Sequence, residues 1–202
     1  MQRPRGRQRR NHVFRPIRAG CAVLLLAACA TSPVPTPIGP SIAPGPSTPE
    51  LASGTVTEGD ITLAATAEPV VVRAGQLIRV EAVLTHDQPE PLVVSGSGSG
   101  IVVFSVTRLE DGLTSGPPVM TSDCGRHELP AGEPLVVPFF KSGGYGPGDA
   151  NAEFMESYLA TPDLRLPAGT WQIDVTAHGT LGEGCDGQQL RHALSLLVTV
   201  TE

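Results

Sequence analysis

Trp171-Gln172-Ile173-Asp174-Val175-Thr176-Ala177 places an apolar side chain at every second position and a polar one between. Because successive side chains of a β-strand point to opposite faces, this heptapeptide predicts a strand with one buried face and one face in water. The same period of two recurs at residues 61–65, 78–84, 102–106 and 194–200. Shorter apolar runs, most of them bounded by Gly, Pro or Asp-Gly turn signals, predict strands at 92–94, 119–122 and 134–141. We therefore expect an all-β fold of about seven or eight strands, arranged as an antiparallel sandwich of two sheets.

The residues just before this strand form a turn signal. Leu166-Pro167-Ala168-Gly169-Thr170, followed by Trp171 and alternating aliphatics, resembles the late strand of bacterial immunoglobulin-like domains. The resemblance implies one immunoglobulin-like β-sandwich over residues 51–202, in which the turn fixes the start of the strand and Trp171 fills the core. Antibody-type domains set cysteines on an early and a late strand, whereas here Cys124 lies mid-domain and Cys185 follows the Trp171 strand. A disulfide between these two residues would therefore differ from the antibody one.

A short helix is predicted upstream of this turn, over residues 152–158. Asp149 or Asn151 would cap its N-terminus, and Phe154 and Tyr158, four residues apart, would share one face. Since the segment makes only one or two turns, we interpret it as an insertion into the sandwich and not as a layer of the fold.

The N-terminus has the composition of an export signal. Seven arginines and no acidic residue lie within residues 3–18, and an apolar run follows at 19–28. A membrane-spanning helix needs about 20 apolar residues, so this run is too short. It ends in Leu26-Ala27-Ala28-Cys29, which resembles the lipobox of bacterial lipoprotein signal peptides. Cys21 fits that pattern less well, because Arg18 stands where the lipobox has an apolar residue.

The lipoprotein resemblance implies that the chain is cut before Cys29 and that this cysteine is acylated. Two or more acyl chains hold a protein firmly at a bilayer. The mature protein is then attached through Cys29 to the extracytoplasmic face of the cell membrane without spanning it. The export route stays open, because Arg9-Arg10 is followed by Asn11 and His12 and not by the apolar pair of twin-arginine signals.

Charge and composition divide the remaining chain into a tether and a folded domain. The first 28 residues hold seven of the 14 basic residues and none of the 20 acidic ones, so the mature chain carries 7 minus 20, or −13. A net charge this negative repels the phosphate backbone, so electrostatic attraction to nucleic acids is not expected. Residues 29–50 contain seven prolines and no aromatic residue, which predicts a disordered tether. At about 3.1 Å per residue the 21 residues after Cys29 reach at most roughly 65 Å. The predicted organisation is a signal peptide at 1–28, a tether at 29–50 and one domain at 51–202.

Cys124 and Cys185 are left as an even pair once Cys29 is acylated. In an oxidising compartment the pair predicts a disulfide. The alternative is a zinc site made of Cys124, His127 and Cys185, with His192 as a fourth ligand, although the paired short spacings of structural zinc motifs are missing. His86 and His178 are predicted to lie at the surface.

Catalytic and cofactor motifs do not match the chain. There is no Gly-x-Ser-x-Gly segment, Lys141-Ser142 lacks the glycines of a phosphate loop, and Phe154 replaces the glycine of a calcium loop that would start at Asp149. We therefore predict no catalytic residue, metal or cofactor. The Gly-rich stretches at 95–100 and 142–148 are either plain connections or one recognition rim of the sandwich. Within them Ser142, Gly143, Gly144 and Tyr145 form the candidate contact loop, with Tyr145 as an exposed anchor for a peptide or sugar.

These observations favour a lipid-anchored surface protein that binds another protein or a cell-envelope component, or serves as an envelope accessory, without catalysis. A metal- or small-ligand-binding lipoprotein that uses Cys124, His127 and Cys185 is one alternative. A hydrolase of unrecognised type is the other, and it would need a cleft with convergent polar groups.

Overall fold

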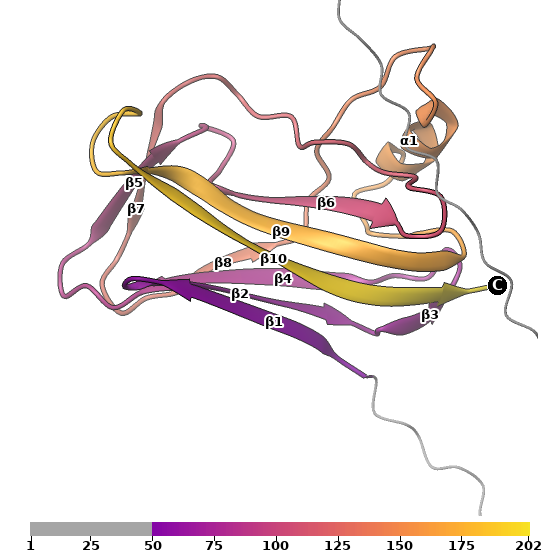
Figure 1. Cartoon of the computed structure of the whole chain (residues 1–202), viewed down its shortest axis with the longest axis horizontal. Coiled ribbons are helices and arrows are strands. Elements are labelled where there is room, and N and C mark those ends of the chain that lie inside the picture. Colours follow the sequence, from indigo (N-terminus) through magenta and orange to yellow (C-terminus); the bar gives the residue numbers. More distant parts are fainter. Residues whose placement is uncertain (1–49) are drawn as a thin grey trace, which may run out of the picture. The chain divides into compact units, whose positions relative to one another are not determined.

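Two stacked β-sheets make up most of the computed structural model, which describes residues 50–202 (Figure 1). This arrangement confirms the predicted all-β class and the two-sheet sandwich for this part of the chain. The predictions for the signal peptide, for acylation of Cys29 and for the tether up to residue 49 lie outside the described residues.

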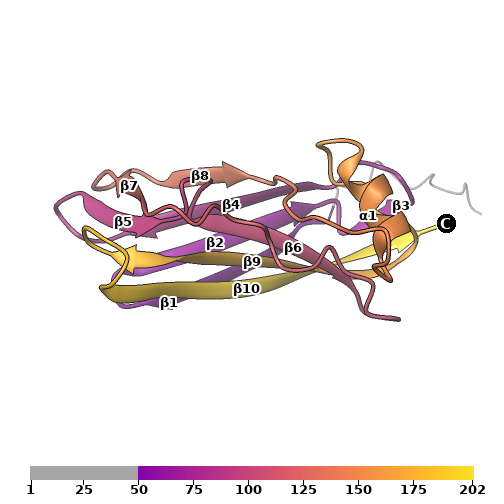
Figure 2. The same ribbon diagram turned by 90° about the horizontal axis from the view of Figure 1, so that it is seen from above.

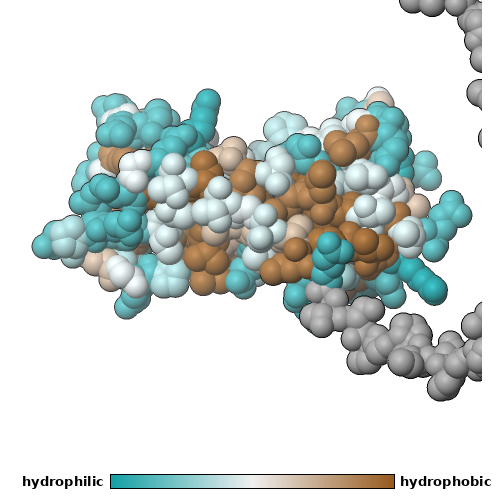
Figure 3. All heavy atoms as spheres, turned by 60° about the horizontal axis from the view of Figure 1, so that its bottom comes forward, coloured by the Kyte–Doolittle hydropathy of each residue, from teal (hydrophilic) through white to brown (hydrophobic). Residues whose placement is uncertain are grey.

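The four-stranded sheet is antiparallel throughout and has the order β1-β2-β4-β8. Its strands are β1 (Ala52–Glu58), β2 (Ile61–Glu68), β4 (Arg79–His86) and β8 (Leu135–Pro138). Leu63 and Leu84 lie opposite each other on its inward face and are fully buried. On the outward face Ala64, Val83 and Val136 lie side by side. Figure 3 shows this outward face as a mixture of hydrophobic and hydrophilic side chains.

The six-stranded sheet is built around the long strand β9 (Gly169–Leu181). β10 (Gln188–Thr201) pairs with one edge of β9 along nearly its whole length. The other edge of β9 pairs with β6 (Val102–Arg108) and, near its last residues, with β5 (Leu92–Gly96). β7 (Gly125–Leu129) extends the sheet beyond β5. β3 (Val71–Arg73) pairs with the end of β10 and is parallel to it.

The strands β1, β3 and β7 were not predicted from the sequence. β1 turns Ala52, Gly54 and Val56 inward, and a Cβ at Gly54 would lie 3.3 Å from Leu194 Cδ1 of β10. Little space is therefore left for a side chain at Gly54, and the small residues Ala52 and Gly54 weaken the apolar signal of this strand. The predicted strand at 119–122 is wrong, because this segment pairs with no strand; Thr121 Oγ1 instead lies 2.7 Å from the hydroxyl of Ser97.

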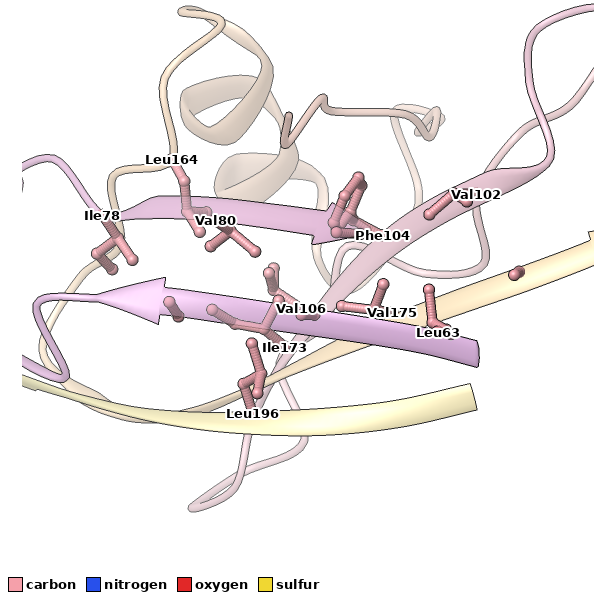
Figure 4. Close-up of a cluster of buried hydrophobic side chains, with 14 of the residues drawn as sticks. Leu63, Ile78, Val80, Val102, Phe104, Val106, Leu164, Ile173, Val175 and Leu196 are labelled. Carbon is pink, nitrogen blue, oxygen red and sulfur yellow. The ribbon is translucent and has the colours of Figure 1, made fainter. Parts of the chain in front are cut away.

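The core lies between the inward faces of the two sheets, and Figure 4 shows Leu63 and Ile173 among its aliphatic side chains. Trp171 is fully buried, and its Nε1 donates a 2.9 Å hydrogen bond to the carbonyl of Pro167. Phe104 of β6 packs edge-on against Phe140, with ring centroids 5.7 Å apart. Because burial of one large apolar side chain contributes about 1.5–3 kcal/mol, this continuous core holds the two sheets together.

The helix α1 (Ala152–Leu159) confirms the predicted insertion and lies at one end of the sandwich, here called the α1 end (Figures 1 and 2). The folded part also begins and finishes at this end. Val70 N donates to the carbonyl of Glu50, and Ala74 N donates to the carbonyl of Thr201. No helix among the described residues reaches the length and hydropathy that a membrane span requires.

Candidate functional site

The Gly-rich segment 142–148 joins β8 to α1 and holds the candidate contact loop. Gly143 has φ +139°, and a Cβ there would lie 3.1 Å from the carbonyl oxygen of Ser115, so this position favours glycine. The hydroxyl of Ser142 is buried. Gly144 has open space around it, and the side chain of Tyr145 is 43% exposed. The loop is thus closely packed at Gly143 and presents Tyr145 to solvent.

Next to α1 lies a hollow of about 700 Å³, here called the α1 hollow, and residues 142–148 are not part of its lining. Lys141 and Asn151, which flank the loop in sequence, both line it. Its aromatic wall is Phe154, whose ring stacks on Tyr158 and on Trp171, with centroids 5.4 Å apart in both pairs. Since Trp171 belongs to the core, the wall of the hollow is fixed to the sandwich and does not depend on α1 alone.

Among the charged groups that line the α1 hollow, Lys141 holds the helix. Lys141 Nζ donates to the carbonyl of Tyr158 and, at 2.9 Å, to that of Thr161, so its charge lies at the C-terminal end of α1. Burial lowers the pKa of Lys141. Burial also raises the pKa of Tyr158 to about 12, which keeps its phenol neutral at physiological pH. Asn151 does not cap the helix with its side chain; its Nδ2 donates to the carbonyl of Thr114 at 2.8 Å.

The two Gly-rich stretches lie at opposite ends of β9, so the prediction that they form one rim is wrong. Ser95 of the first stretch pairs with Thr180 near the end of β9, whereas the second stretch leads into α1, which stacks on Trp171 near the start of β9. Nine residues of strand separate these positions, or about 30 Å at 3.3 Å per residue. Only segment 142–148 therefore connects residues that line the α1 hollow, namely Lys141 and Asn151.

Cys124 and Cys185 lie at the opposite end, here called the disulfide end, with their sulfur atoms at the bonding distance of 2.00 Å. Cys185 is in the turn between β9 and β10, and Cys124 immediately precedes β7. His127 Nε2 is 2.8 Å from the carbonyl of Ser97, and His192 is buried next to the carbonyl of Ile61. The ligands of the alternative zinc site therefore do not converge, and residues 50–202 hold no cluster of three or more metal-binding side chains.

Both histidines that were predicted at the surface are at least partly buried, which corrects that prediction. His86 is 6% exposed because it continues the inward positions of β4, and its Nε2 lies 3.0 Å from the carbonyl of Leu129. His178 is half-buried although it lies on the outward face of β9, because residues 120–123 lie against the same part of that face.

A Ser–carboxylate pair is the strongest catalytic arrangement in the described residues. Ser195 Oγ donates to Asp174 Oδ1 at 2.6 Å, across the outward faces of β10 and β9. Asp174 Oδ1 also accepts from Gln172 Nε2 at 2.7 Å. The hydroxyl therefore has a carboxylate acceptor but no imidazole within hydrogen-bonding distance among residues 50–202, and neither residue lines the α1 hollow. This pair does not make the nucleophile–base arrangement of a hydrolase.

Comparisons of the chain with protein-family models, with curated proteins and with solved structures gave no match. The site is therefore interpreted from its own geometry.

Proposed function

We propose that the protein is a lipid-anchored, non-catalytic binding module on the extracytoplasmic face of the cell membrane. The N-terminal sequence supports the anchor, since Leu26-Ala27-Ala28-Cys29 follows an arginine-rich segment and a short apolar run. The charge of −13 on the mature chain supports attachment through lipid and not through a basic surface. The tether at 29–50 links the acylated Cys29 to the folded domain.

The domain is proposed to be immunoglobulin-like. The order of its strands supports this, because β2, β4 and β8 follow one another in one sheet as strands A, B and E do, and β6, β9 and β10 follow one another as C, F and G do. Two features depart from antibody domains. Trp171 is on β9, the counterpart of strand F, and Cys124–Cys185 links loops at one end of the sandwich.

The contact surface of the module is the loop 142–145 together with the α1 hollow. This assignment rests on the exposed ring of Tyr145, on a Gly-rich loop that connects two lining residues of the hollow, Lys141 and Asn151, and on the aromatic wall of that hollow. Tyrosine combines a large apolar ring with a hydroxyl and is enriched at protein interfaces. A protein or cell-envelope partner would place an apolar group against Phe154 and also contact the exposed ring of Tyr145.

The anchor is tested by Cys29→Ser, with Cys21→Ser as the matched control. We expect the Cys29→Ser protein to lose its acyl mass and to leave the detergent phase, while Cys21→Ser is processed like the parent. If both variants partition and mature like the parent, Cys29 is not the acylated residue.

The contact surface is tested by crosslinking in cells followed by mass spectrometry of what the protein captures. Tyr145→Ser removes the proposed anchor, and Val136→Ser removes an exposed apolar side chain on the outward face of the four-stranded sheet. We expect the captured species to be lost with Tyr145→Ser and retained with Val136→Ser. Equal capture by the parent and by both variants would argue against this surface.

A further inference from the structure

A second hollow, a groove of about 530 Å³, lies on the outward face of the six-stranded sheet near the disulfide end. Here it is called the distal groove. Outward side chains of β9 and β10 line it, among them Thr176, His178 and Arg191, together with residues 120–123. Its volume is within the range of about 300–1,000 Å³ typical of ligand sites. The distal groove shares no lining residue with the α1 hollow.

The disulfide connects the two segments that border the distal groove. Cys185, in the turn between β9 and β10, lines the groove itself, and Cys124 directly follows Asp123 of the lining segment 120–123. The bond therefore holds this turn and this segment at a fixed separation. Such a cross-link reduces the ordering cost of binding, because the lining is already in place before a ligand arrives.

Hydrogen-bonding groups of both kinds line the distal groove. Arg191 is an exposed donor and makes no ion pair with any carboxylate of residues 50–202. Asp123 is an acceptor: hydrogen bonds from Thr121 and from Gly98 N lower its pKa, so it is ionised at neutral pH. Gln189 donates through Nε2 to Thr180 Oγ1 at 3.2 Å, which leaves its carbonyl oxygen without a partner among the described residues. Ser and Thr residues also line the groove, and several of their hydroxyls, among them those of Ser95 and Ser97, form hydrogen bonds within the protein.

The charges of the distal groove distinguish between classes of ligand. His178 pairs directly across the strands with Arg191. Burial first, and the charge of Arg191 second, lower the pKa of His178, so its imidazole is neutral at pH 7. Its Nε2 makes no hydrogen bond to any described residue. An anion in the groove would thus be attracted by Arg191 and repelled by the carboxylate of Asp123. The mature chain as a whole carries a charge of −13, which also repels an anion. A neutral polyol, whose hydroxyls donate and accept, matches this lining without a charge conflict.

We propose that the distal groove is a binding site for a neutral saccharide, held by hydrogen bonds from Arg191 and to Asp123 and Gln189. No Phe, Tyr or Trp of the described residues lines the groove, so hydrogen bonds and not stacking supply the affinity. Weak binding to single sugars is therefore expected, with selectivity set by the positions of the hydroxyl groups. This site is independent of the surface around Tyr145, and either one can fail without the other.

The test is saturation-transfer NMR on the mature chain carrying Cys29→Ser, which keeps it free of lipid, with its disulfide oxidised. The probes are glucose, galactose, mannose and N-acetylglucosamine at millimolar concentration, and inorganic phosphate is followed separately by its phosphorus relaxation. We expect saturation transfer to at least one sugar. Arg191→Ala and Gln189→Ala should each weaken the binding of that sugar about tenfold, as expected for loss of a hydrogen bond at a charged or well-placed polar group.

The matched control is Arg79→Ala, which removes an exposed arginine from the outward face of the other sheet. It should bind the same sugar as the parent does, and all three variants should keep the melting temperature of the parent. Three results would overturn the proposal: no transfer to any of the four sugars, an equal effect of Arg79→Ala and Arg191→Ala, or binding of phosphate alone.

Discussion

Replacing Trp171 tests whether one side chain connects the core to the α1 hollow. Trp171 is fully buried, stacks on Phe154 and donates a hydrogen bond to the carbonyl of Pro167. A buried aromatic side chain removes about 150–250 Å² from water, which at about 25 cal/mol per Å² corresponds to roughly 4–6 kcal/mol as an upper estimate. We expect Trp171→Ala to lower the free energy of unfolding by about 4 kcal/mol.

The more conservative change Trp171→Phe separates packing from hydrogen bonding. It keeps most of the ring but leaves the carbonyl of Pro167 without its donor, and it should cost about 1–2 kcal/mol. The matched control is Leu197→Ala on β10, where the side chain is 55% exposed; it should change stability by about 0.5 kcal/mol or less.

Urea unfolding followed by far-UV circular dichroism measures these changes, because Trp171 is the only tryptophan and its replacement removes the fluorescence signal. Hydrogen exchange should also show faster exchange of the α1 amides in Trp171→Ala, since Phe154 loses the ring on which it stacks. A loss below about 1 kcal/mol in Trp171→Ala, or α1 exchange equal to that of the parent, would refute this reasoning.

Three further predictions concern other parts of the fold. Replacing Cys124 and Cys185 together by Ser removes a cross-link between positions 61 residues apart; the chain-entropy relation gives a loss of roughly 4 kcal/mol in urea unfolding, and a change under about 1 kcal/mol would contradict it. A hydrogen bond from Arg108 holds the pKa of Asp111 at about 2, below its ordinary 3.8, so the stabilisation by Asp111 is present above pH 4 and is lost as the pH falls through about 2. Between pH 4 and 2 the free energy of unfolding of Asp111→Asn should therefore fall less than that of the parent. If the two proteins lose stability in parallel over this pH range, the interaction between Arg108 and Asp111 does not stabilise the fold. Gly54→Val should lower stability by about 1–3 kcal/mol through overpacking against β10, and an unchanged thermal midpoint would show that β1 can move away.

Long strands of the sandwich were predictable because their apolar period is strong. Strands β4, β9 and β10 alternate buried residues with more accessible ones over much of their lengths, and each of them, like β6, contains a predicted run. The missed strands have weak local signals. β1 has Gly54 at an inward position, where an added Cβ would lie 3.3 Å from Leu194 of β10, and β7 carries Arg126, His127 and Glu128. Their strand conformation depends on neighbours distant in the chain, which local patterns do not contain.

Less of the candidate sites could be predicted. The exposure of Tyr145 follows from its place among glycines, but the α1 hollow depends on Phe154 meeting Trp171, 17 positions later. The distal groove joins segments near 95, 121, 178 and 191, which only the sheet pairing and the disulfide bring together. The burial of His86 could have been predicted, since His86 is the next inward-facing position of β4 after Leu84.

The position of Glu50 at the α1 end has a mechanical consequence for a protein held from its N-terminal side. Tension that enters before β1 and leaves through a ligand at the disulfide end would run along the strands. The seven residue pairs between β1 and β2 would then be loaded in shear. Hydrogen bonds perpendicular to the strands share such a load and break together, whereas peeling a hairpin from its free end breaks them one at a time. Pulling between the N-terminal side and a ligand at the disulfide end would therefore be resisted by these hydrogen bonds together.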